Sequence, residues 1–322
     1  MLGKLLTEWI NPGRIEAEGY NVKGLDISVN DLVKIYKIGR GIEVQALRGV
    51  SFNVLAGEAV TIMGPSGSGK TTLLNIIGGV DKPTGGTVFA GKIPVHELDE
   101  DMLEKYRLGV IGYVFQTFNL IPVLSAIENV ELPMIAFRVP RSIRVNRAKW
   151  LLEEVGLSGR IHHKPTELSG GEQQRVAIAV ALANDPPVIL ADEPTAELDT
   201  ENALKITKLL VDLSIKHGKT VIISTHDPRI AVRASRIFRL EDGRIIGEYK
   251  PSDLGVKHEG RGKEEDLAEI IKNKLASVEK AMEELVKKLK DGEISMEEFD
   301  RRYNKLRYQM EALKEILRSL GH

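Results

Sequence analysis

The sequence predicts an α/β protein built around a parallel sheet, with some antiparallel β-structure and an appended pair of helices. Short apolar runs alternate with helix-like segments between residues 26 and 250, and the runs 188–191 and 221–224 have the composition of buried parallel strands. Near residue 240, RIFRLEDGRIIGEY alternates around Asp242-Gly243, which predicts a hairpin. After residue 264, apolar residues recur at helical spacings of three and four.

The composition excludes several classes of function. Apolar residues make up 42% of the 322 residues, which is enough for a buried core, and the formal net charge is −1. Because neither sign of charge dominates, we expect no nucleic-acid partner. The chain has no cysteine, which rules out disulfides, cysteine-ligated metals and thiol nucleophiles. No apolar window of about 18 residues predicts a membrane span, and we expect no secretory signal.

Residues 1–25 form a predicted N-terminal extension. One face of a short helix would carry five apolar side chains, those of Leu2, Leu5, Leu6, Trp9 and Ile10. Two interpretations stay open: the helix docks on its own domain, or it lies on a membrane surface or a partner protein. The sequence Asn11-Pro12-Gly13 is typical of a turn and ends the segment.

Residues 26–250 form the predicted main domain, in which strands and helices alternate. Expected strands cover 27–36, 59–63, 88–90 and 110–115, and the two buried runs follow them. One expected helix begins near residue 70 and ends at Gly78, and a second covers 142–155. This alternation favours a central parallel sheet with helices packed on it.

The C-terminal part is predicted as a linker followed by a helical hairpin. Residues 251–263 are polar and glycine-rich, so we expect a linker there. Within 264–322, two helical apolar stripes are expected, Ala268, Ile271, Leu275, Val278, Met282, Leu285 and Leu289, then Phe299, Tyr303, Leu306, Met310, Leu313, Leu317 and Leu320. Lys290-Asp291-Gly292 separates them, and Ser295 with Glu298 resembles a capping box. Because a two-helix hairpin is rarely stable alone, it should dock on the chain or pair with a copy; partner binding is the alternative.

A glycine-rich stretch between a strand and a helix carries the first functional signal. Gly64, Pro65, Ser66, Gly67, Ser68, Gly69, Lys70 and Thr71 fit the pattern G-x-x-x-x-G-K-[ST], and Thr72 follows them. The glycines let backbone N–H groups turn inward and, with the positive helix end, surround an anion. Lys70 would reach the β- and γ-phosphates, and the Thr71 hydroxyl would ligate Mg²⁺. The stretch predicts a nucleotide site, against the plainer interpretation of a glycine-rich turn.

Two adjacent carboxylates end the buried strand at 188–191. Asp192 would hold Mg²⁺ through water, and Glu193 would point at an attacking water. Adjacent acids at a strand end are otherwise explained as a solvated turn. A phosphate site without an acid to anchor its metal would be incomplete, which favours the functional interpretation.

A second glycine-rich loop opens a helix near residue 170. Leu168-Ser169-Gly170-Gly171-Glu172 precedes Gln173-Gln174-Arg175, so the loop forms a second anion cradle at a helix N-terminus. The chain has one such lysine-bearing loop yet two phosphate-binding helix ends. The economical explanation is that two subunits each complete the other's site.

At this point the sequence resembles the ATP-binding subunits of ABC transporters, with LSGGE where the family usually has LSGGQ. The resemblance covers roughly residues 26–250 and implies a P-loop NTPase core with an antiparallel β subdomain and a helical subdomain. It implies that Gln116 contacts the metal and the attacking water, and that His226 orients the γ-phosphate. Tyr36 matches the aromatic residue that stacks on adenine. Ala196 and Val180 depart from the family pattern, where Gly and Arg are usual.

Finer features resemble one subfamily. Residues 115–130 (FQTFNLIPVLSAIENV), 81–86 (DKPTGG) and 34–37 (KIYK) look like the lipoprotein-releasing and macrolide-exporting ATPases, whose dimers bind four-helix permeases. The cell-division ATPase that drives wall hydrolases is a close relative and one alternative. A soluble ABC ATPase of DNA repair or translation is another, and a regulatory module with a working helical tail is a third.

The resemblance implies an ATPase that uses ATP and Mg²⁺ and forms a homodimer in the ATP-bound state. The Mg²⁺ contacts would come from Thr71, Gln116 and Asp192. ATP would lie between the 64–72 loop of one copy and Ser169, Gly170, Gly171 and Glu172 of the other. The partner would be an integral-membrane permease, which places the chain in the cytoplasm at the inner face of the membrane. The apolar residues Phe118, Leu120 and Ile121 are expected to be exposed and to contact that permease.

Overall fold

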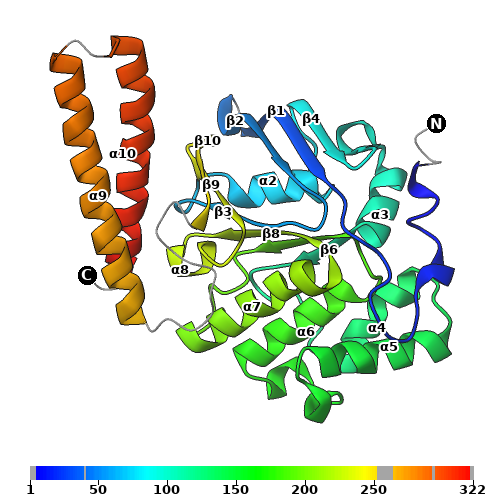
Figure 1. Ribbon diagram of the computed structural model, residues 1–322. Helices are drawn as coiled ribbons and strands as arrows, with labels where there is room; N and C mark the ends of the chain where they lie inside the picture. The colour runs from blue at the N-terminus through cyan, green and yellow to red at the C-terminus, as the bar shows by residue number, and fades with distance from the viewer. Residues whose placement is uncertain (1–4, 40, 252–263, 292–293, 320–322) are drawn as a thin grey trace.

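The computed structural model describes residues 5–39, 41–251, 264–291 and 294–319. These residues form one mostly parallel six-stranded sheet, one antiparallel four-stranded sheet, flanking helices and a long helical pair at one edge (Figure 1). The predicted class is confirmed: a parallel core sheet with an antiparallel β part and a helical part. Among the described residues, no helix is long and apolar enough to cross a membrane.

The six-stranded sheet consists of β3 (Ala59–Met63), β6 (Ile111–Val114), β7 (Val188–Asp192), β8 (Thr220–Thr225), β9 (Arg236–Glu241) and β10 (Arg244–Tyr249). Its order is β10-β9-β3-β8-β7-β6, and only β10 runs antiparallel to its neighbour. Every residue of β3, β7 and β8 is buried. Continuous apolar strands of this kind need cover on both faces, which explains the predicted parallel pairing.

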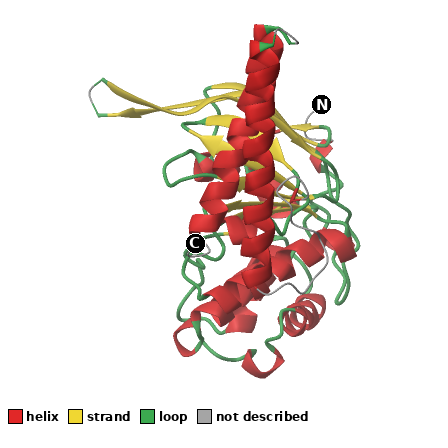
Figure 2. Cartoon of the chain, turned by 60° about the vertical axis from the view of Figure 1, so that its left-hand side comes forward, coloured by secondary structure: helices red, strands yellow, loops and turns green. Residues whose placement is uncertain are grey.

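The four-stranded sheet contains β1 (Ile27–Ile38), β2 (Ile42–Val54), β4 (Gly85–Ala90) and β5 (Ile93–Pro94), in the order β2-β1-β4-β5. The ribbon formed by β1 and β2 projects from the domain (Figure 2). Strand β2 was absent from the prediction. Gly49, at φ +82°, interrupts its alternation of apolar and polar residues, and pairing with β1 overrides that local signal.

The helices of the domain are α2 (Lys70–Ile77), α3 (Glu100–Gly109), α4 (Ala126–Ala136), α5 (Arg141–Glu154), α6 (Gly170–Leu182), α7 (Thr200–His217) and α8 (Pro228–Ala231). Short 3-10 turns cover Pro12–Arg14, Val95–Glu97, Ser158–Arg160 and Pro165–Glu167. Two hydrophobic cores hold these elements. The first lies between the two sheets around α2 and α3, and the second joins α4 to α7 with the opposite face of the parallel sheet. Alternate β7 residues, such as Leu190 and Ile189, enter the two cores in turn.

The described part of the N-terminal extension docks on the domain. Leu6 is buried in the first core, and Leu5 and Trp9 pack against it; Leu2 lies outside the described residues. Polar contacts continue the attachment, because the Asp185 carboxylate accepts hydrogen bonds from the backbone amides of Asn21 and Val22. The apolar face of the segment is therefore used within the chain, and the interpretation as a membrane-facing segment is wrong for the described residues.

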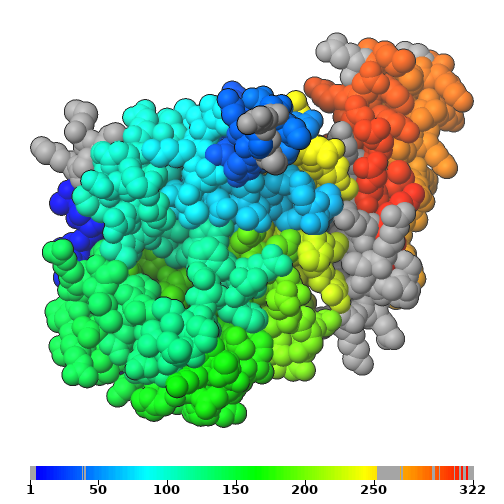
Figure 3. All heavy atoms as spheres, turned by 180° about the vertical axis from the view of Figure 1, so that it is seen from behind, coloured from blue at the N-terminus to red at the C-terminus, as the bar shows by residue number. Residues whose placement is uncertain are grey.

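The helical pair consists of α9 (Glu264–Lys290) and α10 (Met296–Ser319), which pack together along one edge of the domain (Figure 3). The expected linker lies outside the described residues except for Pro251. Ser295 Oγ accepts a hydrogen bond from Glu298 N (3.2 Å), which is half of the predicted capping box. A set of buried residues, called the docking cluster below, joins the hairpin to the domain: Met63, Ala231, Val232, Ile237, Tyr249, Ile271, Val278, Leu313 and Leu317.

Candidate functional site

The glycine-rich loop lies between the end of β3 and the start of α2, and two of its glycines are sterically required. A Cβ at Gly64 would lie 2.0 Å from the carbonyl oxygen of Leu240, so the loop passes directly against β9. Gly69 has φ +103°, and a Cβ there would lie 2.7 Å from the carbonyl oxygen of Ala46. Larger residues at these positions would push the loop away from the two sheets.

The start of α2 has the properties of an anion site. Its N-cap residue, Gly69, makes no side-chain capping hydrogen bond, and the first turn contains no acidic residue. Ser68 Oγ is buried and has no hydrogen-bond partner among the described residues. Uncapped N–H groups at a positive helix end favour an anion, so these residues fit a nucleotide phosphate.

A pocket of about 590 Å³ lies over this loop. Segments that are far apart in the sequence line it together: Ala46, Pro65, Ser66, Gly67, Gly69, Lys70, Thr71, Thr72, Gln116, Glu193, Ala196 and His226. The structure therefore brings the three residues that the sequence suggested for catalysis, Gln116, Glu193 and His226, into the lining of the pocket over the loop.

The charged groups of the pocket form a connected chain. Lys70 is buried, and its Nζ donates hydrogen bonds to the carbonyl oxygens of Gly64 (2.8 Å) and Pro65 (3.0 Å). The same Nζ lies 3.1 Å from Glu193 Oε1. Glu193 Oε2 lies 2.9 Å from Nδ1 of His226, whose side chain is 62% exposed. The Glu193 carboxylate is therefore paired with the Lys70 ammonium that a bound phosphate would need.

A serine on the neighbouring strand orients the Asp192 carboxylate and holds the backbone of Glu193. Ser224, near the end of β8, donates its hydroxyl proton to Asp192 Oδ1 (2.6 Å) and accepts a hydrogen bond from Glu193 N (2.9 Å). Glu193 has φ +45°, an uncommon conformation for a residue other than glycine, and this contact helps to hold it. Sequence reasoning missed Ser224, because its contacts depend on β8 becoming the neighbour of β7 in the sheet.

The oxygen donors near the loop suit Mg²⁺ when a nucleotide supplies further ligands. Thr71 and Gln116 line the pocket and offer a hydroxyl and an amide oxygen, whereas Asp192, whose carboxylate accepts a hydrogen bond from Ser224, does not line it. All three are hard oxygen donors of the kind that Mg²⁺ prefers. The described residues contain no group of three or more His, Cys, Asp or Glu side chains that could hold a metal. A metal here would therefore depend on phosphate oxygens and water for the rest of its coordination.

Tyr36 does not line the pocket. Its hydroxyl donates to Asp81 Oδ2 (2.7 Å), and the Lys34 ammonium lies 4.8 Å from the centre of its ring. A contact with the Thr72 side chain links it to the loop, and burial is the largest cause that raises the pKa of the Tyr36 hydroxyl. The proposed adenine-stacking residue is thus next to the pocket and engaged by polar neighbours.

The second glycine-rich loop lies outside the pocket, at the start of α6. Ser169 Oγ accepts a hydrogen bond from Glu172 N (3.3 Å), and Glu172 Oε2 accepts one from Ser169 N (2.8 Å). A Cβ at Gly171 would lie 3.0 Å from the Asn202 side chain, and one at Gly170 would lie 3.5 Å from Leu198. Within one chain, Ser169, Gly170, Gly171 and Glu172 are therefore packed near the start of α7, and none of them lines the pocket over the first loop.

The electrostatics of this second loop differ from those of the first. The Glu172 carboxylate caps the helix itself and lies 3.2 Å from the Arg160 guanidinium. The Ser169 backbone amide, followed by the smaller effects of the serine hydroxyl and Arg160, lowers the pKa of Glu172. The start of α6 thus already carries a negative group, whereas the start of α2 carries none.

Comparison with known proteins decides the family. The ABC transporter profile matches residues 47–196. An uncharacterized ABC transporter ATP-binding protein of Thermotoga maritima is 52% identical over 217 residues, which cover 67% of this chain and 92% of that protein. The chain belongs to the ABC transporter ATP-binding family. It is therefore an ABC ATPase, and its fold is that of the family.

Two further similar proteins are a dimeric cassette with bound nucleotide and a longer ATP-binding/permease protein. The chain is similar to the dimeric post-hydrolysis structure of the ATP-binding cassette MJ0796 bound to ADP and Pi, with 48% identity, a TM-score of 0.66 and coverage of 70% of this chain and 98% of that one. A macrolide export ATP-binding/permease protein of Hyphomonas neptunium is 46% identical over 222 residues, covering 69% of this chain but 34% of that protein. The N-terminal extension and the helical hairpin lie outside the residues that the family profile matches.

Proposed function

We propose that this ABC ATPase closes as a homodimer around two Mg-ATP and drives a membrane permease of the macrolide-export or lipoprotein-release type. One observation carries the proposal. The loop at 64–72 forms a pocket without the residues of the 169–172 loop, so a nucleotide held between both loops needs two chains. The similar cassette MJ0796 is dimeric with ADP and Pi bound, which supports a nucleotide-bound dimer.

In this proposal, each residue of the pocket has a defined role. Lys70 exchanges the Glu193 carboxylate for the β- and γ-phosphates, and Ser169 and Gly171 of the partner subunit complete the phosphate cradle. Glu193, once released from Lys70, accepts a proton from the attacking water, and His226 holds the γ-phosphate.

Thr71, Gln116 and Asp192 would hold Mg²⁺, which supplies neutralisation of the phosphate charge when bound. Ser224 keeps the Asp192 carboxylate oriented for that contact. Tyr36 would reach the adenine after giving up its contact with Asp81.

The segment after Gln116 is the proposed permease contact. The expectation that Phe118 and Leu120 are exposed was wrong, because both are half-buried and Leu120 packs against the second core. Ile121 is 42% exposed, and Val123 is 74% exposed. These apolar residues near the site would bind a cytoplasmic helix of the permease, which would place the ATPase on the inner face of the membrane.

A subunit-mixing experiment tests the shared site. Lys70→Ala removes the first cradle, and Ser169→Arg blocks the second at an exposed position, so each variant alone should be inactive. In a mixture, the heterodimer retains one intact site formed by the Lys70 of one chain and the Ser169 of the other. We expect mixing to restore ATP hydrolysis.

The control is Lys70→Ala mixed with itself at the same total concentration, which should stay inactive. If the mixture of the two variants also stays inactive while wild type hydrolyses ATP, the sites do not lie between two chains. Copurification with a co-expressed four-helix permease, lost in an Ile121→Asp, Val123→Asp variant, tests the membrane partner separately.

A further inference from the structure

His226, which contacts Glu193, directly follows β8. Two residues later, α8 begins, which is the shortest α-helix among the described residues. α8 begins at Pro228, and Asp227 caps it by accepting a hydrogen bond from Arg229 N (2.8 Å). Thr61 Oγ1 donates to the carbonyl oxygen of Ala231 (3.1 Å) at the other end. The backbone that carries His226 is therefore anchored to Thr225 at the end of β8 on one side, where Asp227 N also donates to Thr225 Oγ1 (2.9 Å), and to this one-turn helix on the other.

The C-terminal hairpin supplies the outer packing of α8. Ala231 and Val232 are buried in the docking cluster together with Leu313 and Leu317 of α10 and Ile271 of α9. Leu313 is fully buried. Figure 1 shows the lower part of the hairpin beside α8, on the side away from the strands. A four-residue helix has too few internal hydrogen bonds to hold its own position, so this packing matters more than it would for a longer helix.

The same cluster reaches Met63, which directly precedes the loop, but the backbone there is held independently. Met63 pairs with Thr225 of β8 and with Arg239 of β9, so strands on both sides constrain it. Gly64 N also donates to the carbonyl oxygen of Thr225 (3.2 Å). Loss of hairpin packing should therefore affect the His226 segment more than the phosphate loop.

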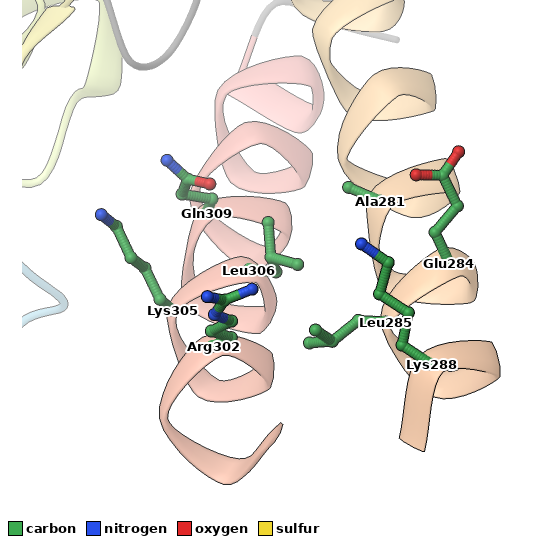
Figure 4. Close-up of a pocket in the computed structure, with 8 residues that line it drawn as sticks. All are labelled: Ala281, Glu284, Leu285, Lys288, Arg302, Lys305, Leu306 and Gln309. Atoms are coloured by element: carbon green, nitrogen blue, oxygen red, sulfur yellow. The ribbon is translucent and has the colours of Figure 1, made fainter. Parts of the chain in front are cut away.

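The distal half of the hairpin has a different environment. Between α9 and α10 lies a groove of about 420 Å³, lined by Leu285, Leu306 and Ala281 with Glu284, Lys288, Arg302, Lys305 and Gln309 (Figure 4). Leu285 is 6% exposed but does not belong to the docking cluster. It offers a matched leucine in the same helical pair, outside the cluster that holds Ala231 and Val232 of α8.

We propose that the hairpin, through Leu313 and the docking cluster, positions His226 for hydrolysis by holding α8 against the sheet. The inference rests on the proposed roles of His226 and Glu193. It makes Leu313 a positioning residue that never touches ATP. Turnover then depends on how the hairpin is docked, whereas nucleotide binding at the 64–72 loop does not.

The test compares Leu313→Ala with Leu285→Ala in the full-length chain. ATP hydrolysis gives kcat and KM, and titration with a fluorescent ADP analogue gives Kd, all well below the measured unfolding midpoint of each variant. For Leu313→Ala we expect kcat to fall about tenfold, as displaced catalytic groups lose rate steeply with distance, with KM and Kd within about twofold of wild type. Leu285→Ala should change none of the three, and Leu313→Met should recover most of kcat.

Several outcomes would overturn the inference. An unchanged or raised kcat in Leu313→Ala would do so. A fall in kcat accompanied by a raised KM and a raised Kd would also do so, as would an equal fall in the kcat of Leu285→Ala. If Leu313→Ala does not fold, Leu317→Ala at the rim of the cluster replaces it, with the same expectations. A wild-type protein without ATP hydrolysis would instead refute the proposed function, so the two failures are distinguishable.

Discussion

The ion pair between Lys70 and Glu193 predicts that Glu193→Gln tightens nucleotide binding and slows ATP hydrolysis. The two groups lie 3.1 Å apart with side-chain exposures of 6% and 12%, so the pair is largely dry. At an effective dielectric constant near 20, the attraction at this distance is roughly 5 kcal/mol before desolvation is subtracted. Hydrogen bonds to charged groups retain about 1.5–3 kcal/mol net. A bound phosphate has to replace this contact.

Glu193→Gln keeps the shape of the side chain and removes its charge. With most of the competing attraction gone, we expect nucleotide to bind about 5- to 30-fold more tightly, the factor that 1–2 kcal/mol gives. Hydrolysis should fall by about 10²- to 10⁴-fold, because the amide cannot accept the proton of the attacking water. The nucleotide should then keep the two subunits together.

Calorimetric titration with ADP and with a slowly hydrolysed ATP analogue measures the affinity, phosphate release measures the rate, and light scattering measures the dimer. Glu58→Gln is the matched control, since Glu58 pairs with Arg236 (3.1 Å) outside the pocket, and it should change none of the three quantities. Hydrolysis at the wild-type rate in Glu193→Gln would exclude Glu193 as the main base. An affinity equal to or weaker than that of wild type would refute the competition between carboxylate and phosphate.

Three further predictions concern single positions. Lys70→Ala should weaken ADP binding about 10- to 100-fold through loss of a charge-assisted contact, and an unchanged dissociation constant would count against the cradle. Gly64→Ala should abolish nucleotide binding, because its Cβ would meet the Leu240 carbonyl oxygen at 2.0 Å. The control, Gly159→Ala, faces open space and should leave binding intact. Equal nucleotide binding by the two variants would contradict the steric argument. Burial lowers the pKa of Lys219 from 10.5 to about 8, so from about pH 8 to 10.5 the unfolded chain binds more protons than the native one, and the free energy of unfolding should rise with pH. Denaturant titrations should show this rise in wild type but not in Lys219→Met, and parallel curves would contradict it.

Much of the site was predictable because its signals are local. The turn from β3 into α2 needs glycines and leaves helix N–H groups free, and both properties follow from eight consecutive residues. The strand ending in Asp192 and Glu193 was equally visible, as a buried run followed by two acids. The predicted turn at Asp242-Gly243 also formed, between β9 and β10.

Contacts between distant segments were not predictable in the same way. Ser224 contacts the Asp192 carboxylate and the Glu193 backbone amide, both more than thirty positions before it, and Tyr36 is held by Asp81 of another segment. No periodicity or composition reveals such pairs, because the contact depends on which strands become neighbours. The half-burial of Phe118 and Leu120 was missed for the same reason.

The sequence by itself determined the α/β class, the loop at 64–72, the acidic strand end and two long apolar helical stripes, since each depends on the chemistry of neighbouring residues. Only the tertiary structure decided that Lys70 is paired with Glu193 and that Leu313 packs with α8 in one cluster. Burial is a property of the folded chain as a whole. An apolar stripe has to be covered, but its sequence does not specify which surface covers it.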